Sequence, residues 1–355
     1  MERADEKLAF MLQYNNIAWY ENGKVKILDR RVYPGQVRFV TCTAYPEVIT
    51  ALKDMVTQSA GPYTAAAAGM ALAAYECRNE TEEKQLAFLE KASHDIANAR
   101  PTTARRMALI TGGCFETAKT ALASGLDVSS AITDYLILTN NRRYNKVYQM
   151  AKHLVSLIPT GGSVMTQCFG ETIVGQMCRV LKEEGKGDVR IFCPETRPYF
   201  QGARLTATVC RDMGMDVTVI TDNMPAFVMK KENVDLFTSA ADAICMDGHV
   251  VNKVGTYQIS IAANYHGIPY YVTGAPDRVH PGIDDVEIEM RDPDFTLQAM
   301  GVRTAAQGVK GYYPAFDITP PSLVSGVVTD AGIYAVDQLE RYYEETDTQP
   351  FELII

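Results

Sequence analysis

The chain has 355 residues, of which 47% are hydrophobic and 22% charged, as in a globular protein with one large domain or two ordinary ones. Its formal net charge of −9 argues against general nucleic-acid binding, because phosphate backbones attract basic surfaces. The charged start MERADEKLAF lacks a signal-peptide core, and no run approaches the length of a membrane span. We therefore expect a cytoplasmic protein that binds neither nucleic acid nor membrane.

The eight cysteines form no CxxC or zinc-type pair, and the five histidines lack the spacing of metal ligands. In a reducing compartment the cysteines are predicted to be free thiols, most of them buried as small hydrophobic side chains. No GxGxxG fingerprint follows a predicted strand. The sequence therefore predicts neither a metal nor an organic cofactor.

Residues 1–135 are predicted to form a small, mainly helical domain with a few short strands. Residues 15–29 alternate around Asn22-Gly23, a dipeptide typical of a β-hairpin turn. Apolar residues then recur at helical spacing over 47–58, 64–78, 81–99, 103–125 and 129–158. The last of these helices should lead into the second domain.

From about residue 160, short apolar strands alternate with helices. The predicted strands are 164–168, 189–193, 217–221, 243–247 and 269–273, and the predicted helices are 171–185, 202–214 and 256–267. This alternation is typical of βαβ units and parallel sheets. We expect an α/β fold with a Rossmann-like parallel-sheet domain over residues 136–355.

Polar residues follow strand-like segments in the runs 163–172, 191–206, 240–257 and 314–326. The carboxyl ends of parallel strands open into one crevice, where ligands bind. If these strands are parallel neighbours, that crevice gathers Cys168, Glu195, Arg197, Gln201, Asp242, Asn252 and Lys253. A thiol, a carboxylate and a cation there favour acid–base chemistry on a small polar substrate.

Two of these residues are candidates for proton transfer. Cys168 ends a strand just before a helix, whose positive end would lower the thiol pKa; the alternative is a buried structural cysteine. Asp242 lies between two apolar segments and is a candidate general base with a raised pKa. The alternative for Asp242 is a helix cap or turn residue.

Other residues are candidates for substrate binding. Asn252-Lys253 precedes a helix start at 255–257, where a lysine and backbone amides suit an anion; a surface lysine beside an ordinary cap is the alternative. Gln201 begins a helix and could donate to a substrate hydroxyl. Arg100 opens another helix and could reach a phosphate, or it could be a solvated arginine.

The segments ETRPYFQGARLT (195–206), NKVGTY (252–257) and PAFDITPPSLVSG (314–326) resemble signature segments of the methylthioribose-1-phosphate isomerase family. That family also contains ribose-1,5-bisphosphate isomerases and regulatory subunits of translation initiation factor 2B. The resemblance covers most of the chain and is strongest over 160–335. It implies a small N-terminal domain, a Rossmann-like C-terminal domain and a homodimer or higher homo-oligomer.

The resemblance also implies residue roles. Cys168 in TQCFGE and Asp242 in AADAI match the catalytic pair of the isomerases. Gln201, Asn252 and Lys253 match substrate-contacting positions, and Arg100 matches a phosphate-contacting arginine. The implied partner is a small sugar phosphate.

Three segments depart from the family pattern. The usual phosphate loop Arg-Gly-Ala-Pro-Ala-Ile-Gly aligns with YTAAAAG (63–69), so that Tyr63 replaces an arginine. In TQCFGE, the histidine that usually precedes the cysteine in methylthioribose isomerases and the asparagine that usually follows it are both absent. The segment DGH (247–249) stands where those isomerases often have Asn-Gly-Asp.

The leading hypothesis is therefore an aldose–ketose isomerase of methionine salvage. It would convert a 5-substituted ribose 1-phosphate, such as methylthioribose 1-phosphate, into the ribulose 1-phosphate by Cys/Asp acid–base catalysis. The alternatives are a non-catalytic sensing or assembly subunit, like the initiation-factor relatives, and an isomerase for a different sugar. The identity of the 5-substituent and the choice between hydride and enediol routes stay open.

Overall fold

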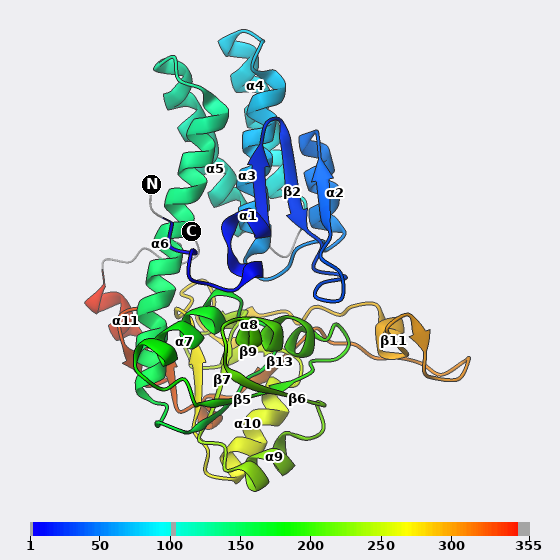
Figure 1. Cartoon of the computed structure of the whole chain (residues 1–355), viewed down its shortest axis with the longest axis vertical. Coiled ribbons are helices and arrows are strands. Elements are labelled where there is room, and N and C mark those ends of the chain that lie inside the picture. The colour runs from blue at the N-terminus through cyan, green and yellow to red at the C-terminus, as the bar shows by residue number, and fades with distance from the viewer. Residues whose placement is uncertain (1–2, 101–103, 347–355) are drawn as a thin grey trace. The chain divides into compact units, whose positions relative to one another are not determined.

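The computed structural model describes residues 3–100 and 104–346. The chain divides into two compact units, the first ending at Asn145 and the second beginning at Lys146. This division falls inside the long helix α6 (Val128–Ser156), which Figure 1 shows in green, whereas the sequence placed the boundary at residue 135.

The first unit joins a small antiparallel sheet to a set of helices. Its strands are β1 (Ala18–Glu21), β2 (Lys24–Leu28) and β3 (Phe39–Cys42), in the order β1-β2-β3. Its helices are η1 (Phe10–Leu12), α1 (Tyr14–Ile17), α2 (Tyr45–Lys53), α3 (Gly61–Cys77), α4 (Glu82–Ala97), α5 (Ala104–Ala123) and the first part of α6. The predicted hairpin is confirmed, with Asn22 and Gly23 both at positive φ in the turn between β1 and β2.

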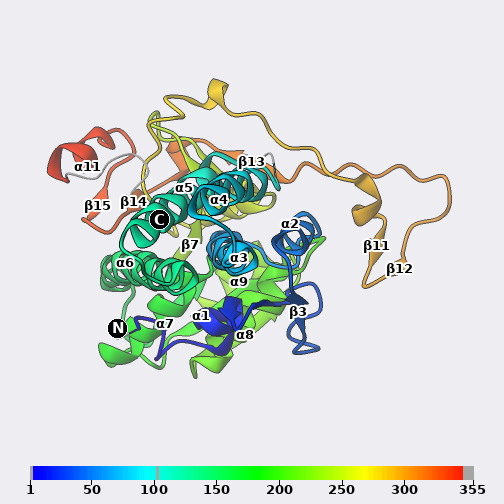
Figure 2. The same cartoon turned by 90° about the horizontal axis from the view of Figure 1, so that it is seen from above.

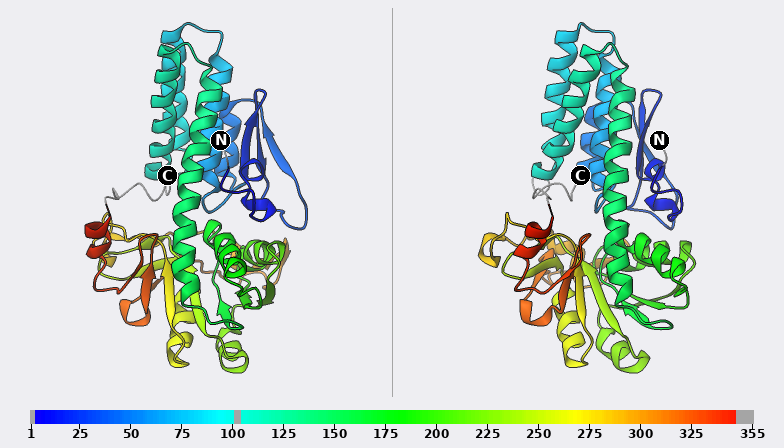
Figure 3. Two further views of the ribbon diagram at one scale, coloured as in Figure 1. Left: turned by 60° about the vertical axis from the view of Figure 1, so that its left-hand side comes forward. Right: turned by 90° about the vertical axis from the view of Figure 1, so that its left-hand side faces the viewer.

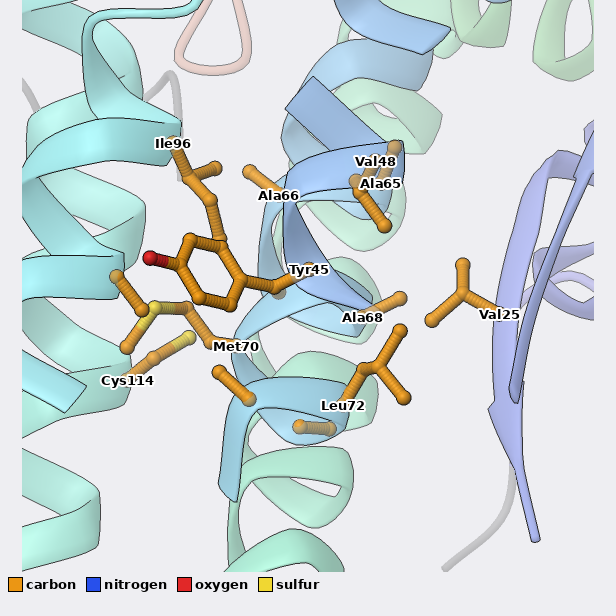
Figure 4. Close-up of a cluster of buried hydrophobic side chains, with 14 of the residues drawn as sticks. Val25, Tyr45, Val48, Ala65, Ala66, Ala68, Met70, Leu72, Ile96 and Cys114 are labelled. Atoms are coloured by element: carbon orange, nitrogen blue, oxygen red, sulfur yellow. The ribbon is translucent and has the colours of Figure 1, made fainter. Parts of the chain in front are cut away.

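Helix α3 forms the centre of this unit because it is buried on nearly all sides. Its run of alanines provides small side chains that let neighbouring elements approach closely. Figure 4 shows Val25 of β2 on one side of α3, and Ile96 of α4 and Cys114 of α5 on the other. Such all-round burial explains why the alanine-rich helix carries no polar face.

The second unit is built on a seven-stranded sheet in the order β15-β14-β10-β7-β4-β5-β6. The strands are β4 (Ser163–Met165), β5 (Arg190–Pro194), β6 (Asp216–Ile220), β7 (Leu236–Ala240), β10 (Tyr270–Thr273), β14 (Gly326–Val328) and β15 (Ile333–Tyr334). All neighbouring pairs are parallel except β14 and β15. This is the strand order of doubly wound nucleotide-binding sheets, so the predicted fold class is confirmed.

Helices connect the parallel strands. They are α7 (Thr172–Glu183), η3 (Gly202–Thr206) continuing into α8 (Ala207–Asp212), α9 (Pro225–Glu232) and α10 (Thr256–Tyr265), and α11 (Glu340–Glu345) follows the sheet. Helix α7 packs beside α8, and α9 beside α10. Figure 3 shows these helices against the green-to-yellow strands of the second unit.

One predicted strand was assigned to the wrong place. The segment 243–247 does not enter the parallel sheet: only Ala243–Ile244 is extended, as β8 of a separate antiparallel sheet with the order β13-β9-β8. The strand that enters the main sheet is β7, which lies just before residues 243–247 in the chain. Strand β9 (Val250–Lys253) pairs antiparallel with β13 (Phe316–Thr319). The run 314–326 therefore contains an antiparallel strand of the separate sheet and does not follow a parallel strand of the main sheet.

Between β10 and β14 the chain makes a long excursion. It contains η4 (Ile283–Asp285), η5 (Pro293–Thr296), the hairpin of β11 (Gln298–Ala299) and β12 (Val302–Arg303), then β13 and η6 (Pro321–Leu323). Figure 2 shows the β11–β12 hairpin, in gold, projecting from the second unit. The predicted surface loop 274–285 lies at its start, apart from the short turn of η4 at its end. Within the described ranges, no helix has both the length and the apolar character that crossing a membrane requires.

Candidate active site

The strand order creates a switch point between β4 and β7 in the second unit. These strands are parallel neighbours, with Val164 opposite Leu236 and Met165 opposite Phe237. The chain leaves β4 toward β5 on one side and leaves β7 toward β10 on the other, and ligands bind where such connections diverge. Cys168 follows the end of β4 and Asp242 follows the end of β7.

The backbone of Cys168 is held in an unusual conformation by two threonines. Its φ of 59° lies in the left-handed region, which is rare for residues other than glycine. The Cys168 amide donates to the Thr196 hydroxyl at 3.2 Å, and the Thr206 hydroxyl donates to the Cys168 carbonyl. Both threonines come from the β5–α8 connection, so the neighbouring connection sets the position of the thiol.

Thr196 is itself fixed by Asp222, which follows β6. The amides of Thr196 and Arg197 donate to the two carboxylate oxygens of Asp222 at 2.7 and 2.6 Å. Three successive strands thus contribute, through their following loops, to the placement of Cys168.

The pKa of Cys168 differs from the sequence-based expectation. Burial raises the pKa of the Cys168 thiol to about 11, although the charges of Lys253 and Arg291 oppose the shift and that of Asp242 adds to it. Helix α7 begins only at Thr172, so its positive end does not outweigh the burial of the thiol. The predicted low pKa is wrong, and the side chain keeps its proton at neutral pH.

Asp242 lies beside strand β9 rather than in an apolar pocket. Its amide donates to the Val251 carbonyl at 2.9 Å, and its side chain is exposed. The expected apolar surroundings are therefore absent. The charge of Asp242 raises the pKa of Cys168 and that of Lys253, so the three groups lie within electrostatic range of one another.

Lys253 is a buried cation at the end of β9. It is 5% exposed, its Nζ donates to the Ala315 carbonyl at 2.9 Å, and Nζ lies 4.5 Å from the centre of the Phe316 ring. Burial lowers its pKa, while the nearby Cys168 and Asp242 favour its charged form. A buried ammonium with one hydrogen bond retains donors for an anionic ligand.

The backbone amides at the start of α10 are not open to an anionic ligand as predicted, because a protein carboxylate accepts from them. The amides of Gly255 and Tyr257 donate to Asp317 at distances of 2.6 to 3.2 Å. Asn252, which is 5% exposed, donates to the Thr256 hydroxyl at 2.9 Å.

Gln201 precedes the helical turn that contains Thr206. Its side chain is 8% exposed, and its Oε1 has no hydrogen-bond partner within the described part of the chain. A buried acceptor of this kind is available to a ligand hydroxyl.

Arg100 belongs to the first unit, between α4 and α5 and just before residues 101–103, which lie outside the described ranges. The stretch 63–69, which aligns with the family's phosphate loop, is not a loop: it lies inside helix α3. The structure thus brings Cys168, Asp242 and Lys253 together in the second unit, with Gln201 and Asn252 on adjoining elements.

Sequence reasoning missed a second cation and its neighbours. Arg291 donates through Nε and Nη2 to Glu289, and its guanidinium lies 5.6 Å from the same Phe316 ring that Lys253 contacts. The amide of Arg291 donates to the carbonyl of buried Tyr313 at 2.9 Å. These residues lie in an irregular segment without periodicity, so no sequence signal placed them at the site.

An apolar hollow adjoins the Cys168 loop. It is lined by Leu154, Thr166, Gln167, Gly170, Ile173, Val174, Met177, Thr238, Ser239, Ala240 and Thr273. Gln167 and Gly170 belong to the loop that carries Cys168. Among the described side chains, no group of three or more His, Cys, Asp or Glu is arranged to hold a metal ion.

Fold and site define a Rossmann-like α/β protein with a thiol and a carboxylate at the switch point of its sheet. Residues 57–336 match the Initiation factor 2 subunit family, and the chain belongs to that family. It is 33% identical over 329 residues to the methylthioribose-1-phosphate isomerase of Chloroflexus aurantiacus, covering 89% of this chain and 94% of that relative.

Two solved structures are similar over nearly the whole chain. The 5-methylthioribose 1-phosphate isomerase of Pyrococcus horikoshii OT3 has a TM-score of 0.80 at 29% identity, covering 93% of this chain and 96% of the other. The translation initiation factor eIF-2B, subunit delta, from A. fulgidus has a TM-score of 0.77 at 30% identity, covering 96% and 99%.

Proposed function

We propose that this protein is an aldose–ketose isomerase that converts a 5-substituted ribose 1-phosphate, methylthioribose 1-phosphate or a close analogue, into the ribulose 1-phosphate. The observation that carries the proposal is the placement of Cys168 and Asp242 after adjacent parallel strands, in a chain similar along its length to proteins named as such isomerases. This activity would place the protein in methionine salvage.

In the proposed reaction Cys168 is the acid and Asp242 the base. The phosphate on the anomeric oxygen prevents ordinary ring opening, so the Cys168 thiol gives its proton to the ring oxygen as the bond from that oxygen to carbon 1 breaks. A hydrogen then moves from carbon 2 to carbon 1, and Asp242 takes the proton of the carbon-2 hydroxyl as the ketone forms. A thiol pKa of about 11 supports this assignment, because the acid must be protonated before the reaction.

The remaining residues would bind the substrate. Lys253 supplies a buried positive charge beside Cys168, suited to phosphate or to negative charge that develops during the reaction. The unpartnered Oε1 of Gln201 would accept from a sugar hydroxyl, and Asn252 would contact the sugar beside it. Arg100, in the first unit, stays a phosphate-contacting residue only as the resemblance implies.

A second candidate function is a non-catalytic sensing or assembly subunit. The observation in its favour is the 30% identity to an initiation-factor subunit over nearly the whole chain. The presence of both Cys168 and Asp242 favours the enzyme, and Tyr63 in place of the expected arginine favours a changed ligand.

The deciding experiment incubates the purified protein with a series of 5-substituted ribose 1-phosphates and follows ketose formation. We expect ketose from at least one of them, and the Asp242→Asn variant serves as the matched inactive control. An absence of turnover with every substrate, together with stable association into larger assemblies, would favour the second candidate.

A further inference from the structure

Tyr313 is a buried residue of this site to which the proposed reaction gives no role. Its side chain is 2% exposed, and its hydroxyl interacts with Arg291 but makes no hydrogen bond of ordinary geometry with a described residue. A buried polar group without a well-formed hydrogen bond is unfavourable, and such groups in native proteins call for an explanation. A ligand that supplies the missing partner is one such explanation.

The Arg291 guanidinium lies beside this hydroxyl. Burial raises the pKa of Tyr313 to about 12, and the charge of Arg291 opposes that shift, so the hydroxyl remains a neutral donor at physiological pH. Arg291 itself is held in place, since Nε and Nη2 donate to Glu289 at 2.9 and 3.2 Å. These bonds leave Nη1 for another acceptor.

Both groups lie within electrostatic range of the Cys168 thiol. The charge of Arg291 acts on the pKa of Cys168, and Cys168 in turn acts on that of Tyr313. Lys253 and Arg291 share one aromatic ring, at 4.5 and 5.6 Å from the centre of Phe316. Two cations and the Tyr313 hydroxyl therefore lie within electrostatic range of the predicted acid.

This arrangement suits a phosphate group for a chemical reason. In a ribose 1-phosphate the phosphate is attached to carbon 1, which is one of the two reacting carbons. A side chain that protonates the ring oxygen must therefore have the phosphate close to it. A guanidinium and a neutral hydroxyl are both donors that phosphate oxygens accept from readily.

We propose that Arg291 and Tyr313 together bind the phosphate of the substrate, with Nη1 of Arg291 and the Tyr313 hydroxyl donating to its oxygens. The inference rests on the proposed function for the identity of the substrate. The pair would supply phosphate contacts in a chain where Tyr63 replaces an arginine expected for that role.

The test compares full-length Tyr313→Phe with Tyr312→Phe. Tyr312 is the adjacent residue and is 76% exposed, so its variant controls for loss of a tyrosine hydroxyl in the same segment. Binding of inorganic phosphate is measured by calorimetry, and KM and kcat are measured for methylthioribose 1-phosphate. For Tyr313→Phe we expect phosphate binding weaker and KM higher by about tenfold, the effect of one lost hydrogen bond, and no change for Tyr312→Phe.

A structural role for the hydroxyl would give a different result. Because the hydroxyl interacts with Arg291 only at a geometry outside that of an ordinary hydrogen bond, Tyr313→Phe should leave the melting temperature without phosphate close to that of the wild type. Arg291→Lys provides a second variant that keeps the charge but loses the planar fork, and it too should weaken phosphate binding.

The outcomes separate this inference from the proposed function. If the wild-type protein forms ketose but Tyr313→Phe and Arg291→Lys bind phosphate as Tyr312→Phe does, the inference is overturned and the proposed function stands. If no sugar phosphate is turned over but phosphate binding depends on Tyr313, the proposed function falls and the phosphate site stands.

Discussion

At the scale of single residues, the geometry of Cys168 shows how the fold prepares one side chain. A left-handed φ at a residue other than glycine is unfavourable by about 1–3 kcal/mol and persists only where the surroundings fix it. Here the hydroxyls of Thr196 and Thr206 hold the amide and the carbonyl of Cys168. The strained residue is thus also the predicted acid, in keeping with the clustering of backbone strain at functional sites.

The predicted acid–base pair can be tested by conservative substitutions. Cys168→Ser and Asp242→Asn should each lower kcat by at least about 10²-fold, because a positioned acid or base contributes about 10²–10⁴-fold. The measurement is steady-state ketose formation, with circular dichroism to confirm that each variant is folded. Turnover close to wild type in either variant would remove that residue from the mechanism.

The raised pKa of Cys168 can be tested by alkylation. All eight cysteines are free, and only Cys168 is not fully buried, so iodoacetamide should modify the native protein at this residue. With a thiol pKa of about 11, the rate should rise about tenfold per pH unit between about pH 7 and 9, as the reactive thiolate forms. The rate is followed by mass spectrometry, with Cys168→Ser as the control. A rate that is independent of pH in this range would show a low pKa instead.

At the scale of elements, the helical turn η3 supports the Cys168 loop only because Gly202 has no side chain. A Cβ at this position would lie 1.8 Å from the Pro194 carbonyl oxygen and 2.9 Å from the Thr196 hydroxyl. The backbone of η3 therefore packs directly against the end of β5.

Substitution of this glycine should disturb both stability and the site. Gly202→Ala is expected to lower the free energy of unfolding by about 1–3 kcal/mol, as overpacking does, and to lower turnover by moving Thr196. Gly187→Ala is the matched control, since its nearest neighbour to an added Cβ is 3.9 Å away. Urea unfolding compares the two, and equal stability would show that η3 can move without penalty.

Helix α10 is capped by a carboxylate whose own burial opposes its charge. Burial raises the pKa of Asp317 from 3.8 to about 6, despite the amides of Gly255 and Tyr257 and the charge of Lys253. The native state therefore holds this proton more tightly than the unfolded chain does. The contribution of protonated Asp317 to the free energy of unfolding is complete below about pH 3.8. This contribution is lost as the pH rises through about 6.

Comparison with Asp317→Asn isolates this effect. Between about pH 4 and 7 the wild type should lose up to about 3 kcal/mol of unfolding free energy relative to the variant, the equivalent of the pKa shift. The asparagine oxygen can still accept from the amides but does not titrate in this range. Urea unfolding at several pH values provides the measurement; parallel curves for both proteins would contradict the raised pKa.

At the scale of the whole molecule, the resemblance implies self-association, and the second unit has surface features consistent with it. Met300, Val302 and Tyr312, on the excursion around the β11–β12 hairpin, are 81%, 65% and 76% exposed. Exposed apolar side chains on a projecting segment often mark a protein interface.

We expect the protein to sediment as a homodimer or higher homo-oligomer, at a multiple of the 39.2 kDa chain mass. Sedimentation velocity over a range of protein concentrations checks this expectation. A single species of chain mass at micromolar concentration would contradict it.

Local sequence patterns determined much of this protein: the hairpin at Asn22-Gly23, the long N-terminal helices, and the alternation of strands and helices after residue 160. These features depend on periodicity and turn chemistry, which neighbouring residues encode. The candidates Cys168, Asp242 and Lys253 were found because polar residues beside apolar strands, together with family motifs, are visible in the sequence.

Only the tertiary structure decided which strands are neighbours. Local pattern could not choose β7 over 243–247 as the strand of the main sheet, because both segments are short and apolar. It could not show that Asp317 caps α10, that burial raises the pKa of Cys168, or that Arg291 and Tyr313 lie within electrostatic range of the thiol. Each of these depends on contacts between residues far apart in the chain, and such contacts set burial, charge and hydrogen bonding at a site.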